Sequence, residues 1–317
     1  MVLAGIECSP KIFDFRASGI PVQERVDYST RSNAINCIEQ LMAFYLFCFR
    51  AGNYMKKITV LGGDSRLTTA AEILRGYGYE VDIPAAPCED DYRSSDVLLL
   101  PVPTTRDGET LAAPNIKKKI YLADIARSTP DSTLILSCNY MFEGKRCIDY
   151  GKNDAYCLLN AVPTAEGAIA LAIEKTPFTL WGSRALVIGC GRVGRILADR
   201  LKALGCRVTV SARKPADFAL ISAAGYYTAK TAEIKKHLNC DIIFNTVDVK
   251  VIEDDDFKKC TASLIVDLSS KGGFNAAAAE ENGITAIKAP GLPGKTAPQT
   301  AGEILARTVR DILTTNL

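Results

Sequence analysis

Hydrophobic and polar positions alternate along most of the chain in a pattern that predicts short strands separated by helices. From residue 55 onward, apolar runs of strand length are followed by segments whose apolar residues recur at helical spacing. Strands alternating with helices indicate crossover connections and parallel sheets, so we predict an α/β fold with two doubly wound parallel-sheet domains. The predicted strands are Ile58–Leu61, Tyr79–Ile83, Asp96–Val102, Ser132–Leu136, Cys147–Tyr150, Ala185–Gly189, Cys206–Ser211, Ile242–Asn245, Leu264–Leu268 and Thr285–Ala289.

The segments between these strands predict where one domain gives way to the next. Pro163 opens an apolar segment that we expect to form a helix to about residue 175, crossing a cleft between the domains. Proline and glycine dominate Ala289–Pro298, so we expect a loop there rather than a helix. Further helices are predicted at about 67–75, 120–126, 196–204 and 300–313. The predicted domains are an N-terminal α/β domain, 55–162 plus 296–317, and a cleft helix with a Rossmann dinucleotide-binding domain, 163–295.

Residues 1–54 do not follow the alternating pattern, and their status is open. They have mixed polarity and weak periodicity, whereas Met55 stands directly before the first predicted strand, as at the natural start of an α/β protein. One interpretation is that Met55 is the initiator and that the preceding residues are an upstream reading. The other is a helical extension that packs on the domain or on a partner.

A glycine-rich turn in the second half predicts a dinucleotide site. It follows the apolar run 184–188, precedes a helical pattern, and has the spacing G-x-G-x-x-G. The first glycine permits the tight turn, the second lets backbone N–H groups approach a pyrophosphate, and the third allows close packing of helix on strand. The anion then lies at a helix N-terminus, which favours negative charge. The predicted binding residues of this turn are Gly189, Gly191, Arg192, Val193 and Gly194.

The end of the next strand predicts NADP rather than NAD as the preferred cofactor, although NAD stays possible. An NAD site usually carries a carboxylate there for the ribose 2′-hydroxyl, but this chain has Ser211, Arg213 and Lys214. A guanidinium offers a planar fork to a 2′-phosphate, and an ammonium adds charge. The alternative is a solvated basic loop. Asn245 and Thr246 end a later strand and are predicted to face the nicotinamide.

Composition and charge exclude several other classes of protein. The chain has 317 residues, of which 48% are hydrophobic, and a formal net charge of +2, so we expect no nucleic-acid or membrane partner. Its 11 cysteines lack metal-ligand spacing, which predicts no metal site and favours a reducing cytoplasm. The sole histidine, His237, lies in a polar helical segment and is expected at the surface. Its position argues against the histidine acid–base chemistry of 2-hydroxyacid dehydrogenases.

Five segments together carry a family resemblance: Ile58–Arg66, Leu100–Thr105, Val162–Gly167, Gly189–Gly194 and Ala289–Gly294. In order and spacing they resemble the family of dipicolinate synthase A subunits from spore-forming bacteria, from residue 55 to the C-terminus. The resemblance implies two domains arranged like the formate/glycerate and alanine dehydrogenases. It also implies the flavoprotein-like B subunit of dipicolinate synthase as partner, a homo-oligomer, and a cytoplasmic role in the mother cell during sporulation.

The implied activity is that of an NAD(P)-dependent oxidoreductase that converts dihydrodipicolinate, or its hydrated precursor, to dipicolinate. The substrate is a dianion, so cations should converge on it: Arg66, Arg106 and Lys295 are predicted to bind it, each being alternatively a solvated loop charge. Lys271 and Glu166 are the candidate catalytic residues, although Glu166 is better explained as stabilising a helix N-terminus.

Two other functions stay open from the sequence. The absence of an obvious acid–base residue is compatible with a non-catalytic nucleotide-binding subunit that supports a flavoprotein partner. The loop Pro290–Gly294 before the last helix is also similar to that of methylenetetrahydrofolate dehydrogenases, which suggests another NADP dehydrogenase of that type.

Overall fold

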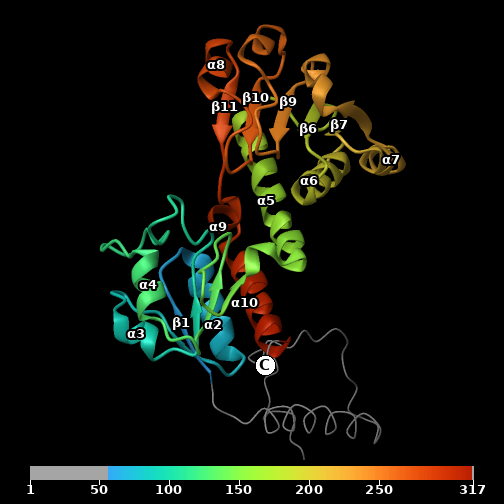
Figure 1. Ribbon diagram of the computed structural model, residues 1–317. Helices are drawn as coiled ribbons and strands as arrows, with labels where there is room; N and C mark the ends of the chain where they lie inside the picture. Colours follow the sequence, from blue (N-terminus) through green and yellow to red (C-terminus); the bar gives the residue numbers. More distant parts are fainter. Residues whose placement is uncertain (1–55, 316–317) are drawn as a thin grey trace, which may run out of the picture. The chain divides into compact units, whose positions relative to one another are not determined.

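The computed structural model describes residues 56–315, and their contacts divide the chain into two compact units between Asp149 and Tyr150 (Figure 1). Each unit is built on its own parallel sheet flanked by helices, which confirms the predicted fold class. The predicted domain boundaries at 162/163 and 295/296 stay a prediction. Both interpretations of residues 1–54 fall outside the described residues.

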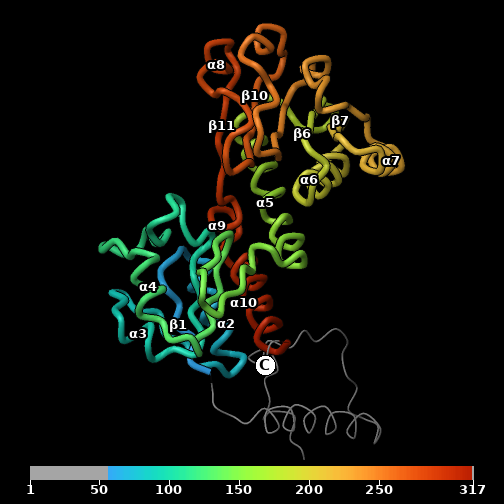
Figure 2. Tube along the Cα trace, viewed as in Figure 1, coloured from blue at the N-terminus to red at the C-terminus, as the bar shows by residue number. Residues whose placement is uncertain are grey.

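Within residues 56–149, five parallel strands form a sheet in the order β2-β1-β3-β4-β5, and Figure 2 follows the trace between them. In β1, Ile58 lies opposite Val81 on one side and Val97 on the other. The strands are β1 (Lys57–Val60), β2 (Glu80–Asp82), β3 (Val97–Leu99), β4 (Leu134–Ser137) and β5 (Cys147–Asp149). The α-helices are α2 (Ser65–Gly76), α3 (Glu89–Arg93) and α4 (Leu122–Ser128).

Helices cover this first sheet because their apolar residues repeat at helical spacing. In α2 the buried face carries Leu67, Ala70, Ala71 and Leu74, which recur every three or four residues. Leu122 and Ile125 of α4 join Leu98 and Ile135 of the sheet in a separate core cluster. The sheet core is therefore largely apolar, and the buried polar side chains of its strands include Thr59, whose Oγ1 accepts a hydrogen bond from Oγ of Ser95 at 2.6 Å.

Within residues 150–315, six parallel strands form the second sheet in the order β11-β10-β9-β6-β7-β8. From β6 the chain proceeds outward through β7 and β8, and then crosses back to β9, so β6 and β9 mark the point where the strand order reverses. Open α/β sheets bind ligands at the carboxyl edge of such a point. The strands are β6 (Arg184–Ile188), β7 (Arg207–Ala212), β8 (Tyr227–Lys230), β9 (Ile242–Asn245), β10 (Leu264–Asp267) and β11 (Thr285–Lys288).

Two helical layers sandwich this second sheet because neighbouring strand residues point to opposite faces. Val187 packs in the cluster that includes α5 (Asp154–Lys175), α6 (Arg192–Ala203) and α7 (Pro215–Ala223). Leu186 packs in the opposite cluster, with the 3₁₀ helices η3 (Thr231–His237) and η4 (Asp254–Lys259) and with α8 (Ala276–Glu281). In Figure 1, α5 and α6 lie side by side; α6 contacts β6, and α5 contacts β10.

The predicted start of the helix at Pro163 is wrong, because α5 begins at Asp154 with Asn153 as its N-cap. The Asn153 side chain accepts a hydrogen bond from the N–H of Tyr156, which satisfies one of the free donors of the first turn. Pro163 lies inside the helix. Buried residues continue through it at helical spacing, from Ala161 to Ala165 and beyond, so packing outweighs the local cost of proline.

The predicted loop at Ala289–Pro298 is also partly wrong, because it contains the short helix α9 (Leu292–Thr296). Gly291 precedes α9 in the left-handed region, and Pro293 occupies the first turn, where no backbone N–H is needed. Pro298 likewise begins α10 (Pro298–Thr315). Proline and glycine thus mark helix starts here rather than a continuous loop. The helix α3 and the strand β8 were not predicted from the sequence.

By length and composition, α5 is the one helix among residues 56–315 that could cross a membrane. In its most apolar stretch, 44% of the residues are buried inside the protein. A core helix passes the same test, so this is weak support for a membrane span.

Candidate functional site

The loop between β6 and α6 is shaped by two glycines that cannot be replaced without collision. Gly189 has φ +106°, and a Cβ on it would lie 2.5 Å from Oγ1 of Thr246. A Cβ on Gly194 would collide with the carbonyl oxygen of Gly189. These contacts explain the first and third glycines by packing within the protein.

The second glycine has a different surrounding. Gly191 is the N-cap of the 12-residue helix α6, with extended backbone, and a Cβ built on it would have no protein atom within 4 Å. No contact within the described chain therefore requires glycine here. Unpaired N–H groups at a helix N-terminus next to open space suit an anionic group, and they fit the pyrophosphate of a dinucleotide.

Two arginines fix this loop to the rest of the second unit. Arg192 lies 3.0 Å from the carboxylate of Asp154 at the start of α5. Nε of Arg195 donates to the carbonyl oxygen of Cys190 at 2.8 Å, and its Nη2 lies 2.9 Å from Asp217 in α7. Interactions with the Cys190 side chain and with Asp217 raise the pKa of Arg195 above its ordinary value, so it stays charged. The sequence analysis did not identify Arg195 as a site residue. The one indication in the sequence was its position directly after the last glycine of the motif. Val193 is half-buried.

At the end of β7, Ser211 is buried whereas Arg213 and Lys214 are exposed, and the cofactor roles of all three stay predictions. The Ser211 side chain is fully buried: its Oγ accepts the N–H of Gly189 at 3.2 Å and lies 3.2 Å from Oγ1 of Thr231. It supports the glycine loop. Arg213 and Lys214 are exposed, and within residues 56–315 neither side chain has a hydrogen bond or ion pair. Both are available to an anion.

At the ends of β9 and β10, a buried carboxylate orders the neighbouring loop. Asp267 is 1% exposed, and its Oδ1 accepts from Nδ2 of Asn245 at 2.8 Å and from Ser269 N–H at 3.0 Å. Its Oδ2 accepts from Gly273 N–H at 3.1 Å. The Asn245 side chain is thus engaged within the protein. Thr246 donates from Oγ1 to the carbonyl of Ile188 at 2.8 Å, which ties β9 to β6.

A second carboxylate, Asp248, holds the outer part of the same loop. Its Oδ1 accepts from the N–H of Ser270 at 2.7 Å and from that of Lys271 at 3.2 Å. Burial raises the pKa of Asp248, but the bonds from Ser270 and Lys271 outweigh burial and bring it below the ordinary value. The Lys271 side chain is exposed, as is that of Lys295 in α9. Both cations keep their predicted roles as predictions.

Glu166 was predicted at a helix N-terminus, and this placement is wrong because α5 begins 12 residues earlier, at Asp154. Its Oε1 lies 3.3 Å from Nε of Arg200 in α6, and its side chain is exposed. A carboxylate paired with arginine at the surface is a structural tie between α5 and α6. His237, in η3, is half-buried rather than fully exposed. Among residues 56–315, no three His, Cys, Asp or Glu residues are grouped to hold a metal.

In the first unit, Arg66 and Arg106 have very different surroundings. Arg66 is 5% exposed; its Nη2 lies 2.7 Å from Asp64, the N-cap of α2, and 2.8 Å from the carbonyl of Val102. Arg106 is exposed in the loop after β3. Arg66 therefore joins the loops after β1 and β3, and its binding to substrate stays a prediction.

Asn139, at the carboxyl end of β4, is a residue that the sequence reasoning missed. It is exposed, has φ +58°, and its N–H donates to Oδ1 of Asp149 at 2.7 Å. A non-glycine residue in the left-handed region is uncommon, although asparagine adopts it more readily than most, so Asn139 is a candidate by its place at the carboxyl end of the sheet. Its position after a predicted strand was the only available signal.

The second unit matches a family of known function. The family model described as D-isomer specific 2-hydroxyacid dehydrogenase, NAD binding domain, matches residues 166–266. This range holds the glycine loop, the basic residues after β7 and the end of β9. The second unit therefore contains a nicotinamide-dinucleotide-binding domain of the dehydrogenase type.

Relatives match over about four fifths of this chain and nearly all of their own length. The A subunit of dipicolinate synthase from Bacillus subtilis (strain 168) is 33% identical over 286 residues, which cover 81% of this chain and 95% of that protein. The crystal structure of the A subunit of dipicolinate synthase from Bacillus halodurans is similar with a TM-score of 0.73 and 28% identity, over 81% of this chain and 97% of that one. The structure of the corresponding dipicolinate synthase chain from Bacillus subtilis also has a TM-score of 0.73, with 30% identity over 83% of this chain and 97% of that one.

More distant structures share the fold alone. D-lactate dehydrogenase from Escherichia coli has a TM-score of 0.56 at 13% identity, and L-alanine dehydrogenase has one of 0.54 at 14% identity. They cover 82% and 81% of this chain, and 96% and 88% of their own chains. These likenesses agree with the predicted fold class.

Proposed function

The chain belongs to the family of dipicolinate synthase A subunits, and from this membership we propose that it oxidises dihydrodipicolinate, or its hydrated precursor, to dipicolinate with NADP as hydride acceptor. The observation that carries the proposal is the open space around Gly191 at the N-terminus of α6, within a dehydrogenase-type nucleotide domain. A dinucleotide is the ligand that explains a glycine at this position.

The preference for NADP rests on charge. Arg213 and Lys214 follow β7 as exposed, unpaired cations within the described residues, and Lys214 is the N-cap of α7. Asp217, in the first turn of α7, is paired with Arg195. This pairing reduces the repulsion between the Asp217 carboxylate and a 2′-phosphate. A 2′-phosphate offers these cations an opposite charge as well as hydrogen-bond acceptors, whereas a ribose hydroxyl offers only a neutral acceptor.

When bound, the nicotinamide ring supplies the hydride-accepting chemistry. Oxidising a dihydropyridine ring to a pyridine is favoured by aromaticity, so the protein mainly has to hold the two rings in register. Asp267 and Asp248 fix the backbone after β10, and Thr246 ties the end of β9 to β6. We propose that Lys295, an exposed cation of the second unit, binds a substrate carboxylate, and we keep Lys271 as the candidate catalytic residue.

The biological setting follows the family. We propose a flavoprotein-like second subunit as partner and a homo-oligomeric assembly. We also propose a cytoplasmic role in the mother cell of a sporulating bacterium. The name of the relatives, which designates them as the A subunit of a synthase, supports the existence of a partner subunit.

A second candidate function is favoured by one observation. Glu166, the one carboxylate among the two candidate catalytic residues, is paired with Arg200 and so is not free to act as a base. The chain would then bind the nucleotide without performing chemistry, while a flavin-bearing partner oxidises the substrate.

The test follows dipicolinate absorbance and NADPH formation when the purified chain is mixed with enzymatically prepared dihydrodipicolinate and NADP. Equal amounts of dipicolinate and NADPH, formed by the chain alone or with its partner subunit, support the proposal. Dipicolinate formed only with the partner, accompanied by flavin reduction and without NADPH, would establish the second candidate instead.

A further inference from the structure

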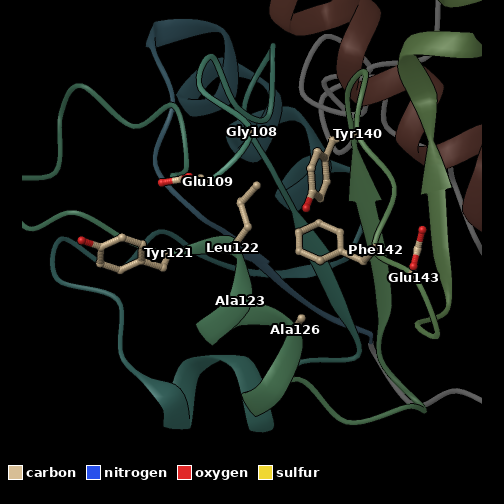
Figure 3. Close-up of a pocket in the computed structure, with 9 residues that line it drawn as sticks. All are labelled: Gly108, Glu109, Tyr121, Leu122, Ala123, Ala126, Tyr140, Phe142 and Glu143. Carbon is tan, nitrogen blue, oxygen red and sulfur yellow. The ribbon is translucent and has the colours of Figure 1, made fainter.

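A pocket of about 350 Å³ opens in the first unit, and none of the functions above uses it (Figure 3). It lies between the N-terminal half of α4, the turn at 105–110 and the loop after β4. The residues that line it are Gly108, Glu109, Tyr121, Leu122, Ala123, Ala126, Tyr140, Phe142 and Glu143. All of them belong to the first unit, whereas the nucleotide site is built from the second.

Aromatic rings form much of the wall. Tyr140 and Phe142 pack edge to face, with ring centroids 4.9 Å apart and an interplanar angle of 73°. Figure 3 shows these two rings on one side and Tyr121 on the other, with Leu122 between them. Tyr121 is 49% exposed. Such a wall suits an apolar stem and can stabilise a cation over a ring face.

The two charged groups of the wall are both carboxylates. Glu109 and Glu143 are exposed and lie on opposite sides of the pocket in Figure 3. Within residues 56–315 neither has an ion pair. Lys145, two residues beyond Glu143, is paired with Asp131 at 2.7 Å instead, and the lysines at 117–119 do not line the pocket.

The backbone at Glu109 is fixed in place. Oδ1 of Asp107 accepts the N–H of Glu109 at 2.9 Å and that of Thr110 at 2.8 Å. The Glu109 carbonyl in turn accepts the N–H of Leu122 at 2.9 Å, which ties the turn to α4. These bonds bring the pKa of Asp107 below its ordinary value, led by that from the Thr110 hydroxyl, so the turn stays held at neutral pH. The position of this carboxylate is therefore set before any ligand arrives.

This chemistry rejects an anion and selects a cation with an apolar stem. A dicarboxylate substrate would be repelled by both glutamates, so the pocket is not a second substrate site. We propose that the pocket binds the side chain of an arginine or lysine presented by a partner protein chain. The aliphatic stem packs between Tyr121 and Phe142, and the charged head lies between Glu109 and Glu143. We infer a basic residue because its charge complements the two glutamates. We infer a protein partner because the relatives are named as one subunit of a synthase.

The test uses three capped tripeptides, with arginine, lysine or citrulline between two glycines, and the full chain. Citrulline keeps the shape of arginine without its charge. Affinity is measured by NMR titration at low and high salt for the wild type and for Glu109→Gln, Glu143→Gln and the double variant. Glu72→Gln is the matched control, because Glu72 is an exposed glutamate in α2 outside the pocket.

We expect the arginine or lysine peptide to bind more tightly than the citrulline peptide. Each glutamate substitution should weaken that binding about 1.4- to five-fold, because an exposed ion pair contributes roughly 0.2–1 kcal/mol. High salt should also weaken the binding of the basic peptides. The Glu72→Gln variant should bind them as the wild type does, and none of the variants should change the affinity for NADP. Equal binding of citrulline, binding unchanged in the double variant, or no binding of either basic peptide at about 10 mM would each overturn the proposal. The peptide titrations test the pocket, whereas NADP titration and turnover test the proposed function. Failure of one proposal can therefore be distinguished from failure of the other.

Discussion

Gly194 packs so closely against Gly189 that a Cβ on Gly194 would collide with the Gly189 carbonyl oxygen, whereas Gly191 in the same loop faces open space. Gly194→Ala should therefore lower the free energy of unfolding by about 1–3 kcal/mol through overpacking. Gly191→Ala keeps an allowed φ of −80° and should change it by less than about 1 kcal/mol, but should weaken NADP binding at least about tenfold by filling the ligand space. Urea unfolding and cofactor titration of both variants provide the comparison. Equal loss of stability in the two would contradict this division of roles.

Arg213 should account for most of the preference for NADP. With two cations near the 2′-phosphate, we expect a preference of about 2–4 kcal/mol, or roughly 30- to 1000-fold over NAD. Arg213→Ala should remove most of it and leave NAD binding nearly unchanged. Arg213→Asp should reverse the preference, so that NAD binds more tightly than NADP. We place the carboxylate at Arg213 rather than at Ala212 because Ala212 is buried, with 4% exposure. Lys235→Ala, at an exposed lysine in η3, is the control. Equal wild-type affinities for the two cofactors would rule this assignment out.

Arg66 and Arg106 should differ in what their loss affects. Arg66→Ala leaves Asp64 and the Val102 carbonyl without a buried guanidinium, so the free energy of unfolding should fall by about 1.5–3 kcal/mol. Arg106→Ala should leave stability within about 0.5 kcal/mol and raise the KM for the dicarboxylate substrate. Chemical unfolding and steady-state kinetics distinguish the two. A stable Arg66→Ala protein with raised KM would assign Arg66 to the substrate instead.

The ion pair between Arg184 and Asp241 should make stability depend on acid pH. Nη2 of Arg184 lies 2.7 Å from Oδ1 of Asp241, and this bond lowers the pKa of Asp241 below its ordinary 3.8. The unfolded chain therefore binds the proton more readily, so the contribution is full above about pH 5 and is lost as pH falls through the lowered pKa. Asp241→Asn should lower the free energy of unfolding by about 1 kcal/mol at about pH 7, and by progressively less below about pH 4. Urea unfolding of both proteins across this pH range measures the difference. A difference between the proteins that does not change with pH would count against this link.

The alternation of strands and helices was predictable because burial on both faces of a parallel sheet imposes long apolar runs, such as Ile242–Asn245, which is β9 to the residue. The glycine fingerprint was predictable because the turn leaves no room for a side chain at Gly189 or Gly194. The family resemblance was confirmed by a relative of 33% identity. The strands and the glycine spacing can be recognised in short stretches of sequence, although the contact that excludes a side chain at Gly189 comes from Thr246.

Other features depend on contacts that are distant in the sequence. Local proline preference placed a helix start at Pro163, but the buried face of α5 extends well before it, to Tyr156. Ser211 looked like a cofactor ligand because it ends a strand, yet Gly189, 22 residues away, takes up its hydroxyl. The aromatic pocket combines three segments between 108 and 143, and no spacing pattern identifies it.

The carboxylates of Asp267 and Asp248 accept the main-chain N–H groups of residues 269, 270, 271 and 273, so hydrogen bonds within the protein confine the backbone after β10. These amide protons should exchange slowly with solvent deuterium even in the cofactor-free protein. A nucleotide that meets this loop gives up little conformational entropy there, because the backbone is already confined. Its association should therefore be limited by diffusion and orientation rather than by a slow rearrangement of this segment.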